Sequence, residues 1–149
     1  MRALLQRVTS ASVEIDDRIT AEIGKGILVL VGVSIDDSSK DVDYLADKIA
    51  GLRIFGDNGG FDSSIAETDG KILVVSQFTL YGDVRKGRRP SFDKAAPAGF
   101  AKEIYEALVV ALSQKGLTVS SGEFQKKMSV NLVNDGPVTL YIDSKKENN

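Results

Sequence analysis

The chain has 149 residues, of which 19 are basic and 21 are acidic, so its formal net charge is −2. With 42% hydrophobic residues it can form a substantial core, and we expect one domain that spans residues 1–149. Cysteine and histidine are both absent, which excludes disulfides, zinc fingers, thiolate clusters and every nucleophilic device that relies on a thiol or an imidazole.

Membrane-spanning and secretory segments are not predicted. The longest apolar stretch, Ile27 to Val33, is far shorter than the ~20 residues that a membrane-spanning helix requires. The N-terminal sequence MRALLQRVTSASVEI places charges and hydroxyl groups where a secretory signal would need an apolar core. We therefore expect a soluble, cytoplasmic protein without a membrane partner.

The first part of the chain has the pattern of β-strands. The stretches RALLQRV, SVEI and ITAEI alternate between apolar and polar residues, which indicates strands with one face toward solvent. The run GILVLVGV that follows is continuously apolar, as is typical of a strand covered on both faces. Between two of the alternating stretches, EIDDRIT predicts a hairpin turn.

A helix is predicted next. It should begin near Ser38 or Ser39, because Asp41 and Asp43 favour a first helical turn, and it should end before Gly56. Its apolar residues recur at helical spacing, namely Val42, Leu45, Ile49 and Leu52. The tract GDNGGFDSS that follows is rich in turn-forming residues and predicts a loop.

The stretch KILVVSQFTLYGD predicts a central strand. One face of this strand would carry Val74, Ser76, Phe78 and Leu80, and the other would carry Val75, Gln77, Thr79 and Tyr81. Polar groups thus interrupt both faces. Such groups are commonly satisfied by neighbouring backbone in a core strand, so the pattern alone fits a structural role as well as a functional one.

A basic loop, a second helix and two further strands complete the prediction. The helix should run from about Ala98 to Lys115, closed by Gly116, with a core face formed by Phe100, Ile104, Leu108 and Leu112. The stretches LTVSSGEF and MSVNLV are strand candidates. Mostly consecutive strands with two helices predict the α+β class: a single domain with a mixed or antiparallel β-sheet, or a half-barrel, and about two helices packed on it.

Two motifs allow both an ordinary and a functional interpretation. The loop after the central strand concentrates Arg85, Lys86, Arg88 and Arg89, which could bind phosphates or could only be solvated. The sequence NDGPVT, with Gly136 followed by Pro137, consists of common turn formers, and it could equally be backbone shaped for a function.

Three segments together resemble the D-aminoacyl-tRNA deacylase family: MRALLQRVTSASVEID, LVVSQFTLYGDVRKGRRPSF and MSVNLVNDGPVTL. The resemblance runs from Met1 to about Asp143. It implies a homodimeric cytoplasmic enzyme that hydrolyses the ester of D-amino acids on tRNA, and of glycine on the alanine tRNA, with no metal or cofactor. The segment GGFDSSIAETDG departs from a Met-Asn-Leu piece common in the family, and we expect Phe61 and Ile65 to fill the same apolar sockets.

The resemblance also implies the site residues. The family's SQxT strand corresponds to the catalytic set Ser76, Gln77, Phe78 and Thr79, and its Gly-cisPro motif corresponds to Gly136 and Pro137, which would reach into the partner's pocket and read chirality with a main-chain carbonyl. Supporting residues would be Arg7, Met128 and Asn134, and the tRNA-binding candidates are the four basic loop residues. Arg7 is expected on the polar side of the first strand, with a plain surface charge as the alternative.

Two mechanisms and two classes of function stay open. The ribose 2′-hydroxyl of the substrate could assist attack on the ester, or the site could position the attacking water, with backbone amides and Gln77 near the developing oxyanion. Thr79 could instead be a covalent nucleophile, although the chain supplies no obvious base for it. The competing class is a non-catalytic RNA-binding or ribosome-associated module.

Overall fold

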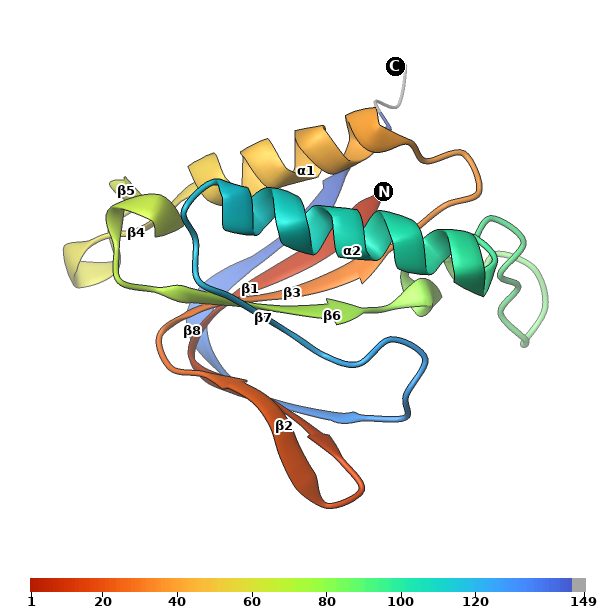
Figure 1. The fold of residues 1–149 in the computed structure, drawn as a ribbon, viewed down its shortest axis with the longest axis horizontal. Coiled ribbons are helices and arrows are strands. Elements are labelled where there is room, and N and C mark those ends of the chain that lie inside the picture. The colour runs from red at the N-terminus through yellow and green to blue at the C-terminus, as the bar shows by residue number, and fades with distance from the viewer. Residues whose placement is uncertain (146–149) are drawn as a thin grey trace.

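The computed structural model describes residues 1–145, and its helices and strands form an α+β fold (Figure 1). The expected domain reaches Asn149, but residues 146–149 lie outside the described part. The strands and helices are β1 (Arg2–Ile15), β2 (Arg18–Ile23), β3 (Gly26–Gly32), α1 (Ser39–Gly51), β4 (Arg53–Phe55), β5 (Ser63–Ser64), β6 (Lys71–Ser76), α2 (Ala98–Gln114), β7 (Val119–Ser121) and β8 (Ser129–Asp143). Three short 3-10 turns are η1 (Asp57–Gly59), η2 (Ile65–Glu67) and η3 (Phe78–Tyr81).

The main sheet is mixed. Its strands follow the order β2-β1-β3-β6-β7, and β8 pairs with β1 as well. β1 is antiparallel to β2, β3 and β8, whereas β6 is parallel to both β3 and β7. Helices α1 and α2 lie together across one face, and the sheet curls away below them (Figure 1). The predicted class, a mixed sheet with two helices packed on it, is confirmed.

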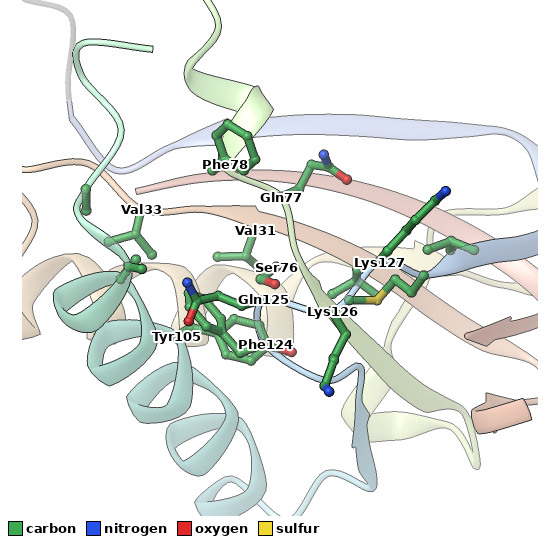
Figure 2. A pocket seen from close by; sticks show the side chains of 16 residues that line it. Val31, Val33, Ser76, Gln77, Phe78, Tyr105, Phe124, Gln125, Lys126 and Lys127 are labelled. Atoms are coloured by element: carbon green, nitrogen blue, oxygen red, sulfur yellow. The ribbon is translucent and has the colours of Figure 1, made fainter. Parts of the chain in front are cut away.

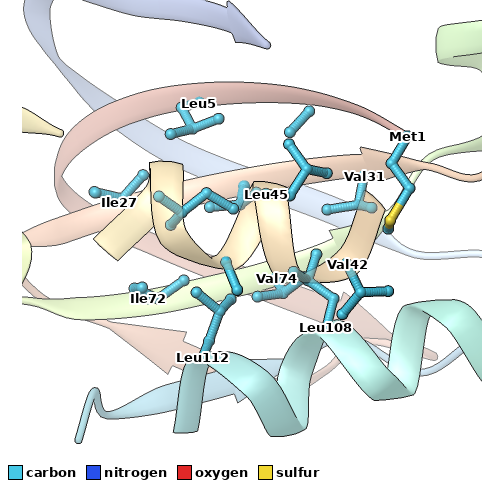
Figure 3. Packing of buried hydrophobic residues seen from close by; sticks show 14 of the residues in the cluster. Met1, Leu5, Ile27, Val31, Val42, Leu45, Ile72, Val74, Leu108 and Leu112 are labelled. Atoms are coloured by element: carbon cyan, nitrogen blue, oxygen red, sulfur yellow. The ribbon is translucent and has the colours of Figure 1, made fainter. Parts of the chain in front are cut away.

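Apolar side chains form a cluster on each face of the sheet. Ile27, Val29 and Val31 of β3 point toward the helices, where they meet Leu45 and Leu108 (Figure 3). The alternate residues of β3 and β6 join a second cluster, enclosed by the curled half of β1 with β2; its members include Val8, Val13, Leu28, Leu73 and Val75. The continuously apolar run is therefore covered on both faces, as its sequence predicted.

The predicted hairpin is the turn between β1 and β2. Asp16 and Asp17 occupy it with φ angles of 49° and 60°. Two successive residues with positive φ form the kind of turn that matches the twist of a two-stranded hairpin, and aspartate tolerates that conformation. The sequence EIDDRIT therefore identified the turn correctly.

The two helices agree with the prediction in position but not in every buried residue. α1 follows Ser38, which forms a reciprocal capping box with Asp41, and Val42, Leu45 and Ile49 are buried. On α2 the buried residues are Ala101, Tyr105, Leu108 and Leu112, while the predicted Phe100 is exposed and Ile104 is only partly buried. The predicted face used residues spaced by four, whereas a helix has 3.6 residues per turn, so such residues do not stay on one face. The prediction was therefore wrong for the first turns of α2.

The central strand ends earlier than its sequence suggested. β6 stops at Ser76, and the chain turns into η3, where Gly82 N donates to Thr79 O at 2.9 Å. The assignment of Gln77 to Tyr81 to alternating strand faces is therefore wrong. The turn approaches Gly32 so closely that an added Cβ there would lie 3.0 Å from Gln77 O. The glycine at the end of β3 thus lets the turn fold over it.

The divergent segment fills one of its two expected sockets. Ile65 begins η2 and is buried in the core, as expected. Phe61 is 55% exposed, so its expected role in the core is wrong. The backbone pairing of Asp62 N with Phe55 O, at 2.8 Å, fixes the loop beside β4 and leaves the neighbouring ring outside.

Candidate active site

A pocket of about 640 Å³ opens where β3 and β6 end (Figure 2). Its walls come from these strand ends, from the start of α2 and from the segment that leads into β8. The lining residues are Val31, Val33, Val75, Ser76, Gln77, Phe78, Ala96, Ala98, Ala101, Tyr105, Phe124, Gln125, Lys126, Lys127, Met128 and Val130. Most of this surface is apolar, with polar groups at the edge where β6 stops.

Three residues of the predicted catalytic set line this pocket, namely Ser76, Gln77 and Phe78, and so does Met128. Thr79 does not belong to the lining, but its hydroxyl accepts a hydrogen bond from the Gln77 side chain. Phe78 is 58% exposed and makes an edge-to-face contact with Phe92, with ring centroids 5.1 Å apart. The end of β6 and the start of η3 therefore bring the set together at the rim.

Aromatic residues on the opposite wall were not predicted as site residues. Tyr105 donates a hydrogen bond to Val74 O at 2.9 Å, and its ring lies 5.8 Å from that of Phe124. Burial raises the pKa of the Tyr105 hydroxyl to about 12, so the group stays protonated near neutral pH. A helical phase that placed Tyr105 on the buried face would have pointed to it, whereas no local signal marks Phe124.

The Gly136-Pro137 motif lies on a bulge of β8. Gln6 pairs with Thr139 and Val8 pairs with Asn134, so two steps along β1 face five steps along β8. The intervening residues leave the ladder, and the peptide bond between Gly136 and Pro137 is cis. Both of these residues are exposed. The motif is thus a projection within one strand.

Polar contacts hold this projection at its base. The Asn134 side chain donates to Arg7 O at 3.0 Å and to Val138 O at 3.1 Å, which ties the two ends of the bulge together. Arg7 donates to Ile54 O at 2.5 Å and forms an ion pair with Asp135, with Nε 2.9 Å from Oδ2. These contacts fix the backbone on both sides of the motif.

Arg7 itself is only 5% exposed. Its side chain lies on the buried face of β1, together with Ala3 and Leu5, so both the expected polar side and the alternative of a surface charge are wrong. The guanidinium tolerates burial because it meets a carboxylate and a carbonyl oxygen. It is a structural link between β4 and the bulge.

The projection does not reach the pocket of its own chain. Neither Gly136 nor Pro137 is among the lining residues, all of which lie within the described residues 1–145. An added Cβ at Gly136 would meet one atom within 4 Å, Asn134 Oδ1 at 3.6 Å. One chain therefore presents a hollow and, elsewhere, an exposed projection.

The basic loop is a closed turn. Asp83 and Ser91 exchange backbone hydrogen bonds of 2.8 and 3.0 Å, and Arg85 forms an ion pair with Asp83 at 2.6 Å. Hydrogen bonds from Arg85 hold the pKa of the Asp83 carboxyl below its usual range. The other three cations, Lys86, Arg88 and Arg89, are exposed.

Residues 1–145 contain neither a cluster suited to a metal ion nor a helix suited to span a membrane. In this part of the chain no three histidine, cysteine or acidic side chains are grouped so as to hold a metal ion. Neither α1 nor α2, nor any other helical segment described, combines the length and the hydropathy of a membrane-spanning helix.

Comparisons with known proteins give consistent matches. A family model described as D-Tyr-tRNA(Tyr) deacylase matches residues 4–143. Proteins named D-aminoacyl-tRNA deacylase from Koribacter versatilis and Thermosipho africanus are 55% and 53% identical, over 99% and 98% of this chain and 99% of each relative.

Solved structures also share the fold. A protein described as c-Myc DNA unwinding element binding protein is 38% identical, with a TM-score of 0.91, over 98% of this chain and 100% of the other. A probable eukaryotic D-amino acid tRNA deacylase superposes with a TM-score of 0.83 at 17% identity, over 95% of this chain and 97% of the other, a likeness of fold alone.

Proposed function

Because the chain belongs to the D-Tyr-tRNA(Tyr) deacylase family, we propose that it is a hydrolase that cleaves the ester bond of D-aminoacyl-tRNA and releases the amino acid and the tRNA. Glycine attached to the alanine tRNA is a second proposed substrate. The observation that carries the proposal is the apolar pocket with Ser76 and Gln77 at its edge, which suits an aminoacyl nucleoside. The protein would act in the cytoplasm, without a cofactor.

The chemistry proposed for this site needs no protein nucleophile. The chain has no cysteine or histidine, and the Tyr105 hydroxyl stays protonated at neutral pH. An aminoacyl ester is activated, and the neighbouring ribose 2′-hydroxyl can assist the attack of water on it. The ester bond then breaks, the amino acid leaves as its carboxylic acid, and the ribose 3′-oxygen takes up a proton. The Gln77 carboxamide and backbone amides at the start of η3 would stabilise the oxyanion as it forms.

Thr79 as a covalent nucleophile is the second mechanism. Its hydroxyl accepts a hydrogen bond from Gln77. A carboxamide nitrogen is a donor and cannot remove a proton, so this contact does not activate the hydroxyl. The geometry therefore favours water as the nucleophile, assisted by the substrate's own hydroxyl.

Selection of the D-enantiomer is assigned to the projection of a second copy. In the proposed homodimer, the bulge with Gly136 and Pro137 enters the partner's pocket, and a twofold axis repeats this contact. The carbonyl of Gly136 would accept from the substrate's amino group and occupy the space that an L side chain needs. The clamp formed by Arg7 and Asn134 would keep that carbonyl in place.

The exposed cations of the basic loop, Lys86, Arg88 and Arg89, would contact the tRNA backbone. They follow η3 along the chain, and η3 begins at the rim of the pocket. Arg85 is already paired with Asp83, so its contribution to phosphate binding would be smaller.

The experiment is an ester-hydrolysis assay with matched enantiomers. Purified protein is added to tRNA charged with D-tyrosine or D-aspartate, and to the same tRNAs charged with the L-forms, and release of amino acid is followed. We expect hydrolysis of the D-esters and survival of the L-esters. Equal hydrolysis of both would contradict the chirality gate, and hydrolysis of neither would contradict the enzymatic function.

A non-catalytic nucleic-acid-binding role is the second candidate. It is favoured by the basic loop and by the name of the 38% identical structure, which describes a protein that binds a DNA element. Binding of uncharged tRNA together with stable D-esters in the same assay would select this role.

A further inference from the structure

We propose that Lys126 and Lys127 bind phosphates of the single-stranded 3′ end of tRNA as it enters the pocket; this inference rests on the proposed function. Of the lining residues, all within the described 1–145, these two are the only charged ones. They lie on the segment that connects Phe124, on the pocket wall, to β8. The mouth is thus positive although the whole chain has a net charge of −2.

The backbone of this segment places the lysines at the mouth. Gln125 adopts a φ angle of 62°, and Lys126 N donates to Glu123 O at 3.4 Å, so the chain turns back before β8 begins. Phe124 is directed to the wall, while Lys126 and Lys127 extend from the segment in different directions (Figure 2). Two cations spread in this way suit two successive phosphates of a strand better than a single anion.

Both ammonium groups are available for a ligand. Both residues are exposed, and none of the ion pairs found among residues 1–145 involves either of them. Glu123 is the one acidic residue on the same segment, and it is exposed as well. The nucleoside carries no charge of its own, so the apolar pocket can accept it while its phosphates stay outside with the lysines.

The test compares two substrates and two matched variants. One substrate is D-tyrosyl-tRNA, and the other is 3′-D-tyrosyl-adenosine, which has the same ester but no phosphate. The variant Lys126→Gln/Lys127→Gln removes both charges. The control Lys25→Gln/Lys71→Gln removes two exposed lysines near the amino ends of β3 and β6, whereas the pocket lies at the carboxyl ends.

For the tRNA ester we expect KM to rise roughly five- to tenfold in the first variant, as for the loss of modest charge contacts at a solvent-exposed site. The dependence of log KM on log salt concentration should fall by ~0.7 for each phosphate contact removed. With the nucleoside ester, the kinetics of the Lys126→Gln/Lys127→Gln variant should match those of the unmodified protein. The control variant should match the unmodified protein with both substrates.

An unchanged KM for the tRNA ester would overturn the proposal, and so would an equal loss with both substrates, which would mean that the lysines only shape the pocket. If the unmodified protein hydrolyses neither ester, the proposed function fails. Fluorescence anisotropy with a short single-stranded RNA that ends in adenosine then decides the lysine proposal: weaker binding by the variant alone supports it, and equal binding overturns it.

Discussion

β6 and β8 both depart from regular strand pairing, but with opposite results. β6 ends at Ser76 and turns over Gly32, which opens a hollow lined mainly by apolar side chains. β8 pairs with β1 on either side of a bulge, where the register shifts and Gly136 and Pro137 are exposed. The hollow is shaped by side-chain packing, whereas the projection is shaped by main chain and polar clamps.

The difference agrees with the proposed dimer, in which the site is formed by two chains. A pocket of small and aromatic side chains can accept a nucleoside, but it offers few polar groups to distinguish one enantiomer from the other. A projection clamped by Arg7 and Asn134 supplies a fixed carbonyl, but it has no pocket beside it. Each feature supplies what the other lacks, which supports the proposal of a site completed in a dimer.

The largest expected effect comes from enlarging the projection. Gly136→Val should reduce D-ester hydrolysis by ~100-fold or more, because misplacement near a reacting centre by about 1 Å can cost that much. In the single chain the added Cβ meets only Asn134 Oδ1, at an ordinary contact distance of 3.6 Å, so the melting temperature should hardly change. The control is Gly24→Val, whose Cβ would meet nothing within 4 Å. Full activity of Gly136→Val would show that the projection enters no pocket.

Removal of the clamp should have the next largest effect. Arg7→Met leaves Asp135 and the Ile54 carbonyl without their partner, and we expect the free energy of unfolding to fall by about 3 kcal/mol. Deacylation at a temperature where the variant is folded should fall as well, since the bulge is no longer fixed. Denaturant titration measures the first effect. Arg18→Met, which removes an exposed arginine of β2, should change neither quantity, and a loss equal to that of Arg7→Met would contradict the assignment.

Much of the fold could be predicted because it depends on local patterns. The alternation along β1, the apolar run of β3 and the Asp16-Asp17 turn each carry their own signal. The end of β6 could not be predicted, because SQFTLY has the sequence pattern of a strand. Only the close approach to Gly32, a residue distant in sequence, allows the chain to turn there. The buried position of Arg7 also depends on partners distant in sequence, Ile54 and Asp135.

The candidate site was predicted unevenly for the same reason. Ser76, Gln77 and Phe78 are contiguous, so one motif identified them all, and the structure places them on one rim. The opposite wall combines Tyr105 with Phe124 and Lys126, which meet only after α2 has packed on the sheet. No spacing in the sequence marks such a wall as part of a pocket.

Thr79→Ala should have a smaller effect, within roughly tenfold in kcat, if water assisted by the substrate's hydroxyl is the nucleophile. Loss of a covalent nucleophile usually costs several orders of magnitude. Single-turnover kinetics with D-tyrosyl-tRNA measures the difference. An aminoacyl ester trapped on Thr79 would make the threonine mechanism the correct one.

The smallest effect is expected on the pocket wall. Tyr105→Phe removes the hydrogen bond to Val74 O and should cost about 1 kcal/mol of stability, with activity between pH 6 and 9 nearly unchanged. Burial raises the pKa of Tyr105 from 10.0 to about 12, so its stabilising effect is present below pH 10 and is lost as pH rises toward 12. The difference in melting temperature between the two proteins should therefore narrow over that range. A difference in melting temperature that stays constant between pH 10 and 12 would contradict this role of Tyr105.

Mixed dimers test the central assignment most directly. One variant, Gly136→Val, keeps the pocket but spoils the projection, and the other, Ala98→Trp, places a large ring at the exposed start of α2 and blocks the pocket. Each should be inactive alone. If the two variants are refolded together in equal amounts, half of the dimers will be mixed. Each mixed dimer will hold one intact site, made of one subunit's pocket and the other's projection. The mixture should therefore recover about a quarter of the normal D-ester hydrolysis. A mixture as inactive as its components would contradict a site shared between two chains.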